Sequence, residues 1–348
     1  MDTLSRLLGG LEGSESELEG AAGPTGEPVG DVRAQWEAAQ AQGAPPRRQG
    51  TEAGNAGRFL DVDEVQAGGG DPRTGRQTAL DEALDIPTVQ PRLCYVVLAM
   101  NLAVYAAGIG IAVAQGNDAS NDFFLALAKV NDSVVAGEYY RLLTATALHA
   151  GLLHLGLNCA ALASVGPQAE AVLGYAGFAT VYLLAGLAGS GASLLASDAV
   201  TVGASGAIFG LLGALGGYFL RNPKLQGSGR QALYIAGVAA LNIALGATQG
   251  SLIDNSGHLG GLAVGVALGL TIGPRWVVRR ELDIPPGALA VPDDAREVAV
   301  VVDATPAWQR AAAAIVAGAL VLGVIMAGVL LRSQVEKGRT GSGACEKP

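Results

Sequence analysis

Charged residues are scarce in this sequence: Asp, Glu, Lys and Arg make up only 15% of its 348 residues, whereas 50% are hydrophobic. A large soluble protein needs more charge on its surface, so this composition favours a membrane protein. The formal net charge is −9 and no basic patch stands out against it. The electrostatic footprint of a nucleic-acid-binding protein is therefore lacking, and we expect no nucleic-acid partner.

Cysteine is rare as well, with only Cys94, Cys159 and Cys345. They are far apart and two of them lie in apolar runs, which argues against a disulfide framework and against a cysteine metal site. We predict neither a metal ion nor a cofactor. Histidine is equally rare, and the chain contains only His149, His154 and His258.

The first part of the chain, residues 1–90, lacks apolar periodicity. It is rich in Gly, Ala, Pro, Glu and Asp, a composition typical of disordered segments. The opening "MDTLSRLLGG" is too short for a secretory signal, and the acidic residues that follow are unusual in an organellar transit peptide. We therefore predict a disordered acidic N-terminal region without a clear targeting signal.

Long apolar runs begin at residue 93. About 20 apolar residues cross the roughly 30 Å hydrocarbon core of a bilayer. On this basis we predict seven spans, at 93–115, 149–166, 175–197, 203–220, 232–250, 257–274 and 309–331. The predicted fold class is an all-α polytopic membrane protein whose surroundings are the lipid bilayer. The predicted parts are a six-helix core (93–274), a polar linker (275–308), an extra C-terminal seventh transmembrane helix (309–331) and a tail (332–348).

The positions of Lys and Arg in the short connectors predict the orientation of the spans. The clusters before span one, between spans four and five and after span six all fall on the cytoplasm-like (cis) side if the N terminus lies there. The first trans-side loop is a mild exception, and the tail, with Arg332, Lys337 and Arg339, disagrees. Spans two, four and six then begin in the same trans-side leaflet, which brings four polar residues to similar depth: His154, Asn158, Ser205 and His258.

Each of these residues also has a structural interpretation. Serine in a membrane helix often serves close packing, and intramembrane His or Asn often forms interhelical hydrogen bonds. Their combination favours chemistry, because a nucleophilic hydroxyl needs a base and the oxyanion needs donors. We predict Ser205 as the nucleophile and His258 as the base. His154 and Asn158, four residues apart on one helix face, form the oxyanion site with the Ser205 backbone N–H.

No acidic residue lies within a span, so we predict a Ser–His dyad and regard Asp254 as a helix cap or a solvated loop residue. Glycines recur every three or four residues in spans four and six, which predicts that the two spans touch along their length. This contact would place His258 beside Ser205. Phe209, one turn below Ser205, either orients the His258 ring or is an ordinary core- or lipid-facing aromatic residue.

Three segments resemble the signatures of the rhomboid intramembrane serine proteases: "GEYYRLLTATALHAGLLHLGLN" (137–158), "GASG" (203–206) and "GHLGGLAVG" (257–265). The resemblance covers residues 93–274 and implies a six-helix core with the nucleophile, base and oxyanion residues named above. It further implies that Phe209 stacks on His258, that Gly203 precedes the nucleophile and that Arg141 holds the first loop. The family usually has Trp-Arg where this chain has Tyr140-Arg141. The supporting residues are Gly203, Gly206, Phe209, Arg141 and His149.

The predicted function is an intramembrane serine endopeptidase that cleaves transmembrane protein substrates near the membrane surface. The alternative is a non-catalytic protein of the same fold that binds membrane helices as a chaperone. A small transporter or channel is a third class, but it should show a charged residue within a span or a pair of broken helices. Several segments look most like plastid and cyanobacterial members. The predicted location is therefore a multi-pass protein of the chloroplast inner envelope, otherwise of another cellular membrane.

Overall fold

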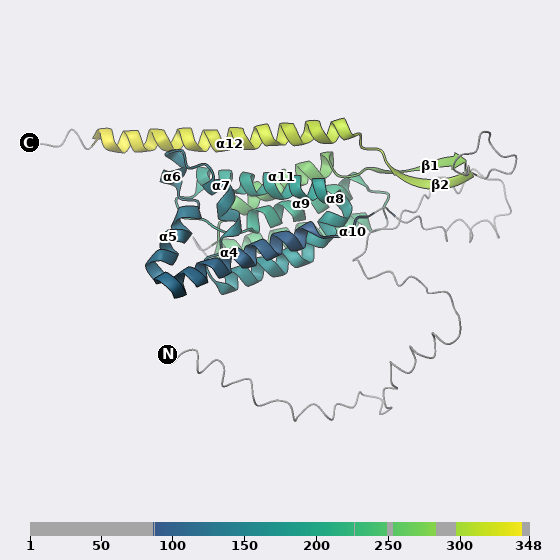
Figure 1. Cartoon of the computed structure of the whole chain (residues 1–348). Helices are drawn as coiled ribbons and strands as arrows, with labels where there is room; N and C mark the ends of the chain where they lie inside the picture. The colour runs from purple at the N-terminus through teal and green to yellow at the C-terminus, as the bar shows by residue number, and fades with distance from the viewer. Residues whose placement is uncertain (1–85, 87, 226, 249–252, 283–296, 343–348) are drawn as a thin grey trace, which may run out of the picture. The chain divides into compact units, whose positions relative to one another are not determined.

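The computed structural model describes residue 86 and residues 88–225, 227–248, 253–282 and 297–342. The predicted N-terminal region (1–90) lies almost wholly outside the described residues. The described chain is mostly helical (Figure 1).

The long helices agree closely with the predicted spans. They are α4 (Leu93–Gln115), α8 (Leu152–Ala196), α9 (Ser205–Arg221), α10 (Ser228–Thr248), α11 (Asn255–Thr271) and α12 (Ala307–Ser342). α4 coincides with the first predicted span. Spans two and three are the two parts of α8, which meet at Gly174, where φ is 70° and ψ is 172°. Only glycine adopts this backbone conformation readily, so Gly174 is the point at which the chain changes direction.

In the described part of the chain, four helices are long and apolar enough to cross a membrane: α4, α8, α10 and the Ala307–Val335 part of α12. α9 and α11 have 17 residues each, which corresponds to about 26 Å of helix. α9 is buried from Ala207 to Tyr218, so its neighbours shield it from lipid. The chain is a polytopic helical membrane protein.

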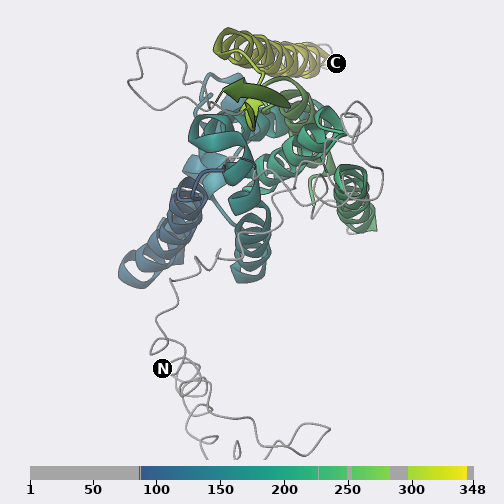
Figure 2. The same ribbon diagram turned by 90° about the vertical axis from the view of Figure 1, so that its right-hand side faces the viewer.

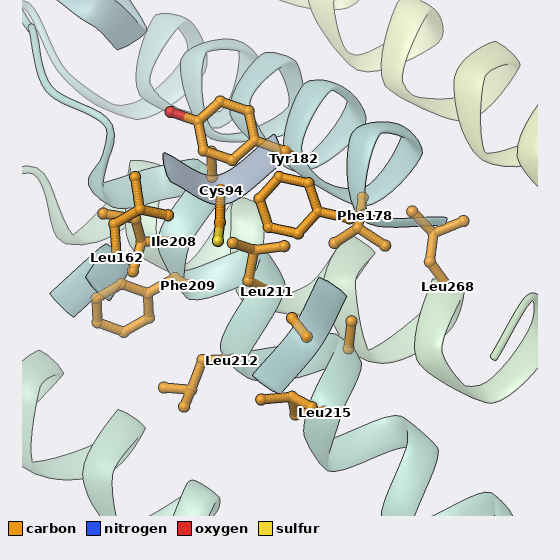
Figure 3. Close-up of a cluster of buried hydrophobic side chains, with 14 of the residues drawn as sticks. Cys94, Leu162, Phe178, Tyr182, Ile208, Phe209, Leu211, Leu212, Leu215 and Leu268 are labelled. Atoms are coloured by element: carbon orange, nitrogen blue, oxygen red, sulfur yellow. The ribbon is translucent and has the colours of Figure 1, made fainter. Parts of the chain in front are cut away.

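The buried hydrophobic core surrounds α9. Figure 3 shows Leu211 of this helix next to Phe178 of α8. Leu215 of α9 and Leu268 of α11 belong to the same cluster. The rings of Phe178 and Tyr182 are stacked with their centroids 6.0 Å apart. Side chains from several predicted spans thus meet around one central helix, and this helix begins with Ser205.

The connector between α4 and α8 contains four short helices that the sequence did not reveal. They are α5 (Asn117–Leu127), α6 (Asn131–Val135), α7 (Arg141–Thr144) and the 3₁₀ helix η1 (Ala145–Ala147). Arg141 is buried and donates hydrogen bonds to the carbonyls of Leu125 and, at 3.0 Å, Ala128. It also pairs with Glu138 at 2.6 Å, and this hydrogen bond lowers the pKa of the Glu138 carboxyl. Arg141 therefore holds the first loop together.

Glu170 binds the beginning of α4. Its carboxylate accepts the backbone N–H groups of Arg92 (2.8 Å), Leu93 (2.7 Å) and Cys94 (2.7 Å). The first N–H groups of a helix lack partners within the helix and carry partial positive charge, so a carboxylate satisfies both needs. The sequence placed Glu170 in a connector, whereas the structure buries it completely within α8.

The predicted polar linker (275–308) contains regular structure that was not expected. β1 (Trp276–Leu282) and β2 (Glu297–Asp303) form an antiparallel pair in which Trp276 lies opposite Asp303. The indole N–H of Trp276 donates to the Tyr218 hydroxyl at 3.0 Å, which attaches the pair to the end of α9. The valines of these segments are typical of strands, and we missed this pattern among the charges.

α12 packs along α8 and α11. Figures 1 and 2 show α12 on the opposite side of the helices from α4. Near its C-terminal end, Arg332 donates to the carbonyl of Leu194, to that of Ser197 at 2.7 Å, and to the Asp198 carboxylate at 2.5 Å. This contact gives a reason why Arg332 departs from the charge pattern of the connectors: its charge is paired with the end of α8.

Candidate active site

Backbone-to-backbone packing joins α9 and α11. A Cβ atom added to a glycine of α11 would lie only 2.0–2.2 Å from a carbonyl oxygen of α9, at Gly261, Gly265 and Gly269. Real Cβ contacts are never this short, so each position requires glycine. The predicted contact between spans four and six is confirmed, and it brings the beginnings of both helices together.

Ser205 and His258 meet at these helix beginnings. The Ser205 Oγ atom lies 2.8 Å from His258 Nε2, within hydrogen-bond distance. Ser205 is the first residue of α9, and His258 lies in the first turn of α11. The imidazole is buried, and the ring of Phe209 stacks on it with a centroid separation of 4.3 Å. The structure therefore places together the pair that the spacing of the spans predicted.

Asp254 caps α11 and does not contact the free nitrogen of the histidine ring. Its Oδ1 atom accepts the Gly257 N–H at 3.0 Å and the Ser256 hydroxyl at 2.7 Å. Among the described residues, His258 Nδ1 has no hydrogen-bond partner. Within the described part of the chain the pair therefore has no third, acidic member. The predicted capping role of Asp254 is confirmed.

His154 and Asn158 lie against the segment that precedes Ser205. A Cβ atom on Gly203 would be 2.8 Å from both Cε1 and Nε2 of His154, and 3.9 Å from Nδ2 of Asn158. Gly203 also has a φ of 123°, which L residues rarely adopt. The Asn158 amide donates to the His154 carbonyl at 3.0 Å, which leaves its second N–H for another acceptor.

The supporting residues have definite contacts. His149 is buried and meets the His154 ring edge-on, with centroids 5.2 Å apart and an interplanar angle of 65°. A Cβ atom on Gly206 would lie 3.4 Å from the Gly257 carbonyl oxygen. Tyr140, which occupies the position of the family's usual Trp, donates its hydroxyl to the Ala126 carbonyl at 3.2 Å. Each of these contacts thus links two neighbouring segments of the fold.

A buried polar cluster near the segment that leads to Ser205 was not expected from the sequence. Lys129, Ser193 and Thr201 are joined by hydrogen bonds, and the side chains of Lys129 and Ser193 are buried. The available signal was a single lysine within the otherwise apolar stretch "FFLALAKV" (123–130). We treated it as an ordinary connector charge.

Comparison with known proteins identifies this part of the chain. Residues 136–275 match the model of the Rhomboid domain. This part of the chain is therefore similar to the Rhomboid domain. The matched range holds Arg141, His154, Asn158, Ser205 and His258, whereas α4 and α12 lie outside it.

The chain is also similar to several curated relatives. It is 38% identical to "Rhomboid protease GluP" of Bacillus subtilis (strain 168) over 196 residues, which cover 54% of this chain and 37% of the relative. It is 35% identical to "RHOMBOID-like protein 7" of Arabidopsis thaliana over 160 residues, 44% of this chain and 50% of the relative. It is 32% identical to "RHOMBOID-like protein 9, chloroplastic" of the same plant over 143 residues, 41% of this chain and 33% of the relative.

The chain thus spans between a third and a half of the length of these relatives. The protein is an integral membrane protein with several apolar helices.

Proposed function

We propose that this rhomboid protein is an intramembrane serine endopeptidase that cleaves transmembrane protein substrates near the trans-side membrane surface. The observation that carries the proposal is the 2.8 Å contact between Ser205 Oγ and His258 Nε2. A serine hydroxyl becomes a useful nucleophile when a base lies within hydrogen-bond reach. The similarity to a relative named as a rhomboid protease supports the same reaction class.

The reaction follows the acyl-enzyme route. With the imidazole proton on Nδ1, Nε2 accepts the Ser205 proton while Oγ attacks the carbonyl carbon of the substrate. His154, the remaining Asn158 N–H and the Ser205 N–H stabilise the oxyanion. His258 then gives its proton to the leaving amine, and the C–N bond breaks. A water molecule, deprotonated by His258, then attacks the acyl carbon. The ester C–O bond breaks, the acid product leaves, and His258 returns the proton to Ser205 Oγ.

The substrate has to unwind near the cleaved bond. Within a helix the peptide carbonyl is hydrogen-bonded and its carbon is shielded, so neither the oxyanion donors nor Ser205 can approach it. We therefore propose a preference for transmembrane helices with small or helix-weakening residues close to the trans-side surface. The plastid remains our predicted location, and the similarity to a relative named as chloroplastic supports it.

The test is cleavage of a model transmembrane substrate by the purified full-length chain in detergent. The wild type should cleave, and Ser205→Ala and His258→Ala should each lose at least about 10³-fold in kcat. Ser164→Ala is the matched control, because Ser164 is an exposed serine of α8. A fluorophosphonate probe should label the wild type and Ser164→Ala but not Ser205→Ala.

Equal cleavage by wild type and Ser205→Ala would overturn the proposal. If the wild type binds transmembrane helices without cleavage and without labelling, the non-catalytic helix-binding alternative holds instead.

A further inference from the structure

Lys129 is buried at the centre of a polar cluster next to the active site. It lies between α5 and α6, and its side chain has an exposed fraction of 0%. Its ammonium group donates to the Ser193 hydroxyl at 2.7 Å. Burial of a lysine is unfavourable unless the charge is compensated, so this position calls for an explanation.

The backbone of Lys129 binds the segment that leads to Ser205. The Lys129 N–H donates to the Thr201 carbonyl at 3.2 Å, and the Thr201 N–H donates to the Lys129 carbonyl at 3.2 Å. Two residues later, the Gly203 N–H donates to the Ala145 carbonyl at 2.9 Å. The connector therefore fixes the course of the chain directly before the nucleophile.

The side chain of Lys129 reaches the other member of the pair through Ser193 and Asp254. Burial raises the pKa of the Asp254 carboxyl, but the hydrogen bonds from Ser193, Gly257 and Ser256 and the charge of Lys129 outweigh it, so the pKa lies below its usual value. Asp254 is thus a carboxylate. It caps the helix of His258, and its own carbonyl accepts the His258 N–H at 3.1 Å.

The cluster has one further pair of charges beside it. Asp198 and Arg332 also act electrostatically on Lys129, and they form an ion pair with each other. Their opposite charges compensate one another, which leaves Asp254 as the counter-charge of Lys129. The Ser193 hydroxyl also lies 3.4 Å from the Thr201 hydroxyl. Ser193 therefore connects the Lys129 ammonium group with the segment that leads to Ser205.

We propose that Lys129 is a positioning residue for the Ser205–His258 pair. Its backbone holds the segment before Ser205, and its ammonium group holds the cap of the His258 helix through Ser193 and Asp254. Lys129 has no contact with the reacting atoms, so it acts through the placement of the two helix beginnings. The inference rests on the proposed endopeptidase function for its effect on rate, whereas the electrostatic coupling of Lys129 and Asp254 can be tested apart from activity.

The first experiment measures fluorophosphonate labelling of Ser205 in the full-length protein. Lys129→Met removes the charge and keeps the length, and Ser193→Ala removes only the bridging oxygen. We expect the second-order labelling rate constant to fall about 10- to 100-fold in both variants, since a displacement on the order of 1 Å has this effect on a reacting pair. The final labelled fraction should remain near that of the wild type, because the helices still pack.

The matched control is Ser190→Ala. Ser190 lies on α8, the helix of Ser193, and donates to the Leu142 carbonyl at 2.8 Å. Ser190→Ala therefore also loses one hydrogen bond between α8 and the connector that joins α4 to α8. It should keep the wild-type rate constant. An unchanged rate constant in Lys129→Met and Ser193→Ala overturns the proposal. So does a loss of labelled fraction at an unchanged rate constant, which is the signature of mere structural weakening.

The second experiment is independent of activity. Thermal unfolding is compared for the wild type, Lys129→Met, Asp254→Asn and the double variant. Each single variant leaves the other charge without its partner and should lower Tm, whereas the double variant should recover part of this loss. Additive losses would show that the link does not exist. If the wild type neither labels nor cleaves, the proposed function fails, while this cycle still decides whether Lys129 and Asp254 are coupled.

Discussion

The phenyl ring of Phe209 lies parallel to the imidazole of His258, with 4.3 Å between the ring centroids and 8° between the planes. Phe209 follows Ser205 by four residues and therefore lies on the same face of α9, one turn further along. The stacked ring restricts the rotation of the imidazole. It thereby keeps Nε2 directed at the serine oxygen.

Replacement of the Phe209 ring should lower turnover without weakening substrate binding. We expect Phe209→Leu to reduce kcat about 10-fold with little change in KM, because the ring contacts the base and not the expected position of the substrate. Phe209→Tyr keeps the stacked ring and is the control that should retain more of the activity. Steady-state cleavage of a transmembrane substrate gives both constants. Wild-type kcat in Phe209→Leu would contradict an orienting role for the ring.

The contact between α9 and α11 should not tolerate a single methyl group. A Cβ atom on Gly261 would lie 2.0 Å from the Gly206 carbonyl oxygen, so Gly261→Ala must separate the helices next to Ser205. We expect a loss of about 1–3 kcal/mol in the free energy of unfolding and a strong loss of Ser205 labelling. Gly237→Ala on α10 is the control, because nothing lies within 4 Å of its added Cβ atom. If Gly261→Ala and Gly237→Ala had the same Tm, the tight contact between α9 and α11 would be disproved.

The cap of α4 should make Glu170 one of the most sensitive residues for stability. Glu170→Gln keeps the shape but directs an NH₂ group toward backbone N–H donors, so some of them lose their acceptor. We expect a loss of about 2–4 kcal/mol in the free energy of unfolding. Gln168→Ala, at an exposed position of the same helix, is the control and should stay within about 0.5 kcal/mol. Denaturant or thermal unfolding in detergent measures the stability of Glu170→Gln and Gln168→Ala relative to the wild type.

The sequence contained enough information for the Ser205–His258 pair but not for its surroundings. Both residues begin apolar spans that run in one direction, and glycine repeats mark the contact between these spans, so local patterns sufficed. Lys129 holds its neighbours in place through contacts with Ser193 and Thr201, which are distant in sequence. A helix such as α6, with five residues, has no usable periodicity. The burial of Glu170 could not be predicted either, because its hydrogen-bond partners lie 76–78 residues earlier in the chain.

Lys129 should give the protein a pH-dependent stability at alkaline pH. Burial lowers the pKa of Lys129 from 10.5 to about 8. Between these two values the folded protein binds fewer protons than the unfolded chain, so the contribution of Lys129 to stability rises with pH from about 8 to about 10.5. Lys129→Met should lack this rise. The measurement is thermal unfolding of both proteins across the window, and parallel curves would show that Lys129 does not titrate there.

The contact of Arg332 with the end of α8 should depend on its shape more than on its charge. The guanidinium group donates hydrogen bonds to the Leu194 and Ser197 carbonyls and to the Asp198 carboxylate at the same time. A lysine ammonium group cannot reach all three acceptors. Asp198 is 93% exposed, and exposed ion pairs contribute only about 0–1 kcal/mol. We therefore expect Arg332→Lys and Arg332→Met to lower Tm by similar amounts, and Asp198→Asn to have a much smaller effect. If Arg332→Lys matches the wild type while Asp198→Asn is as damaging as Arg332→Met, the ion pair and not the bound carbonyls attaches α12 to α8.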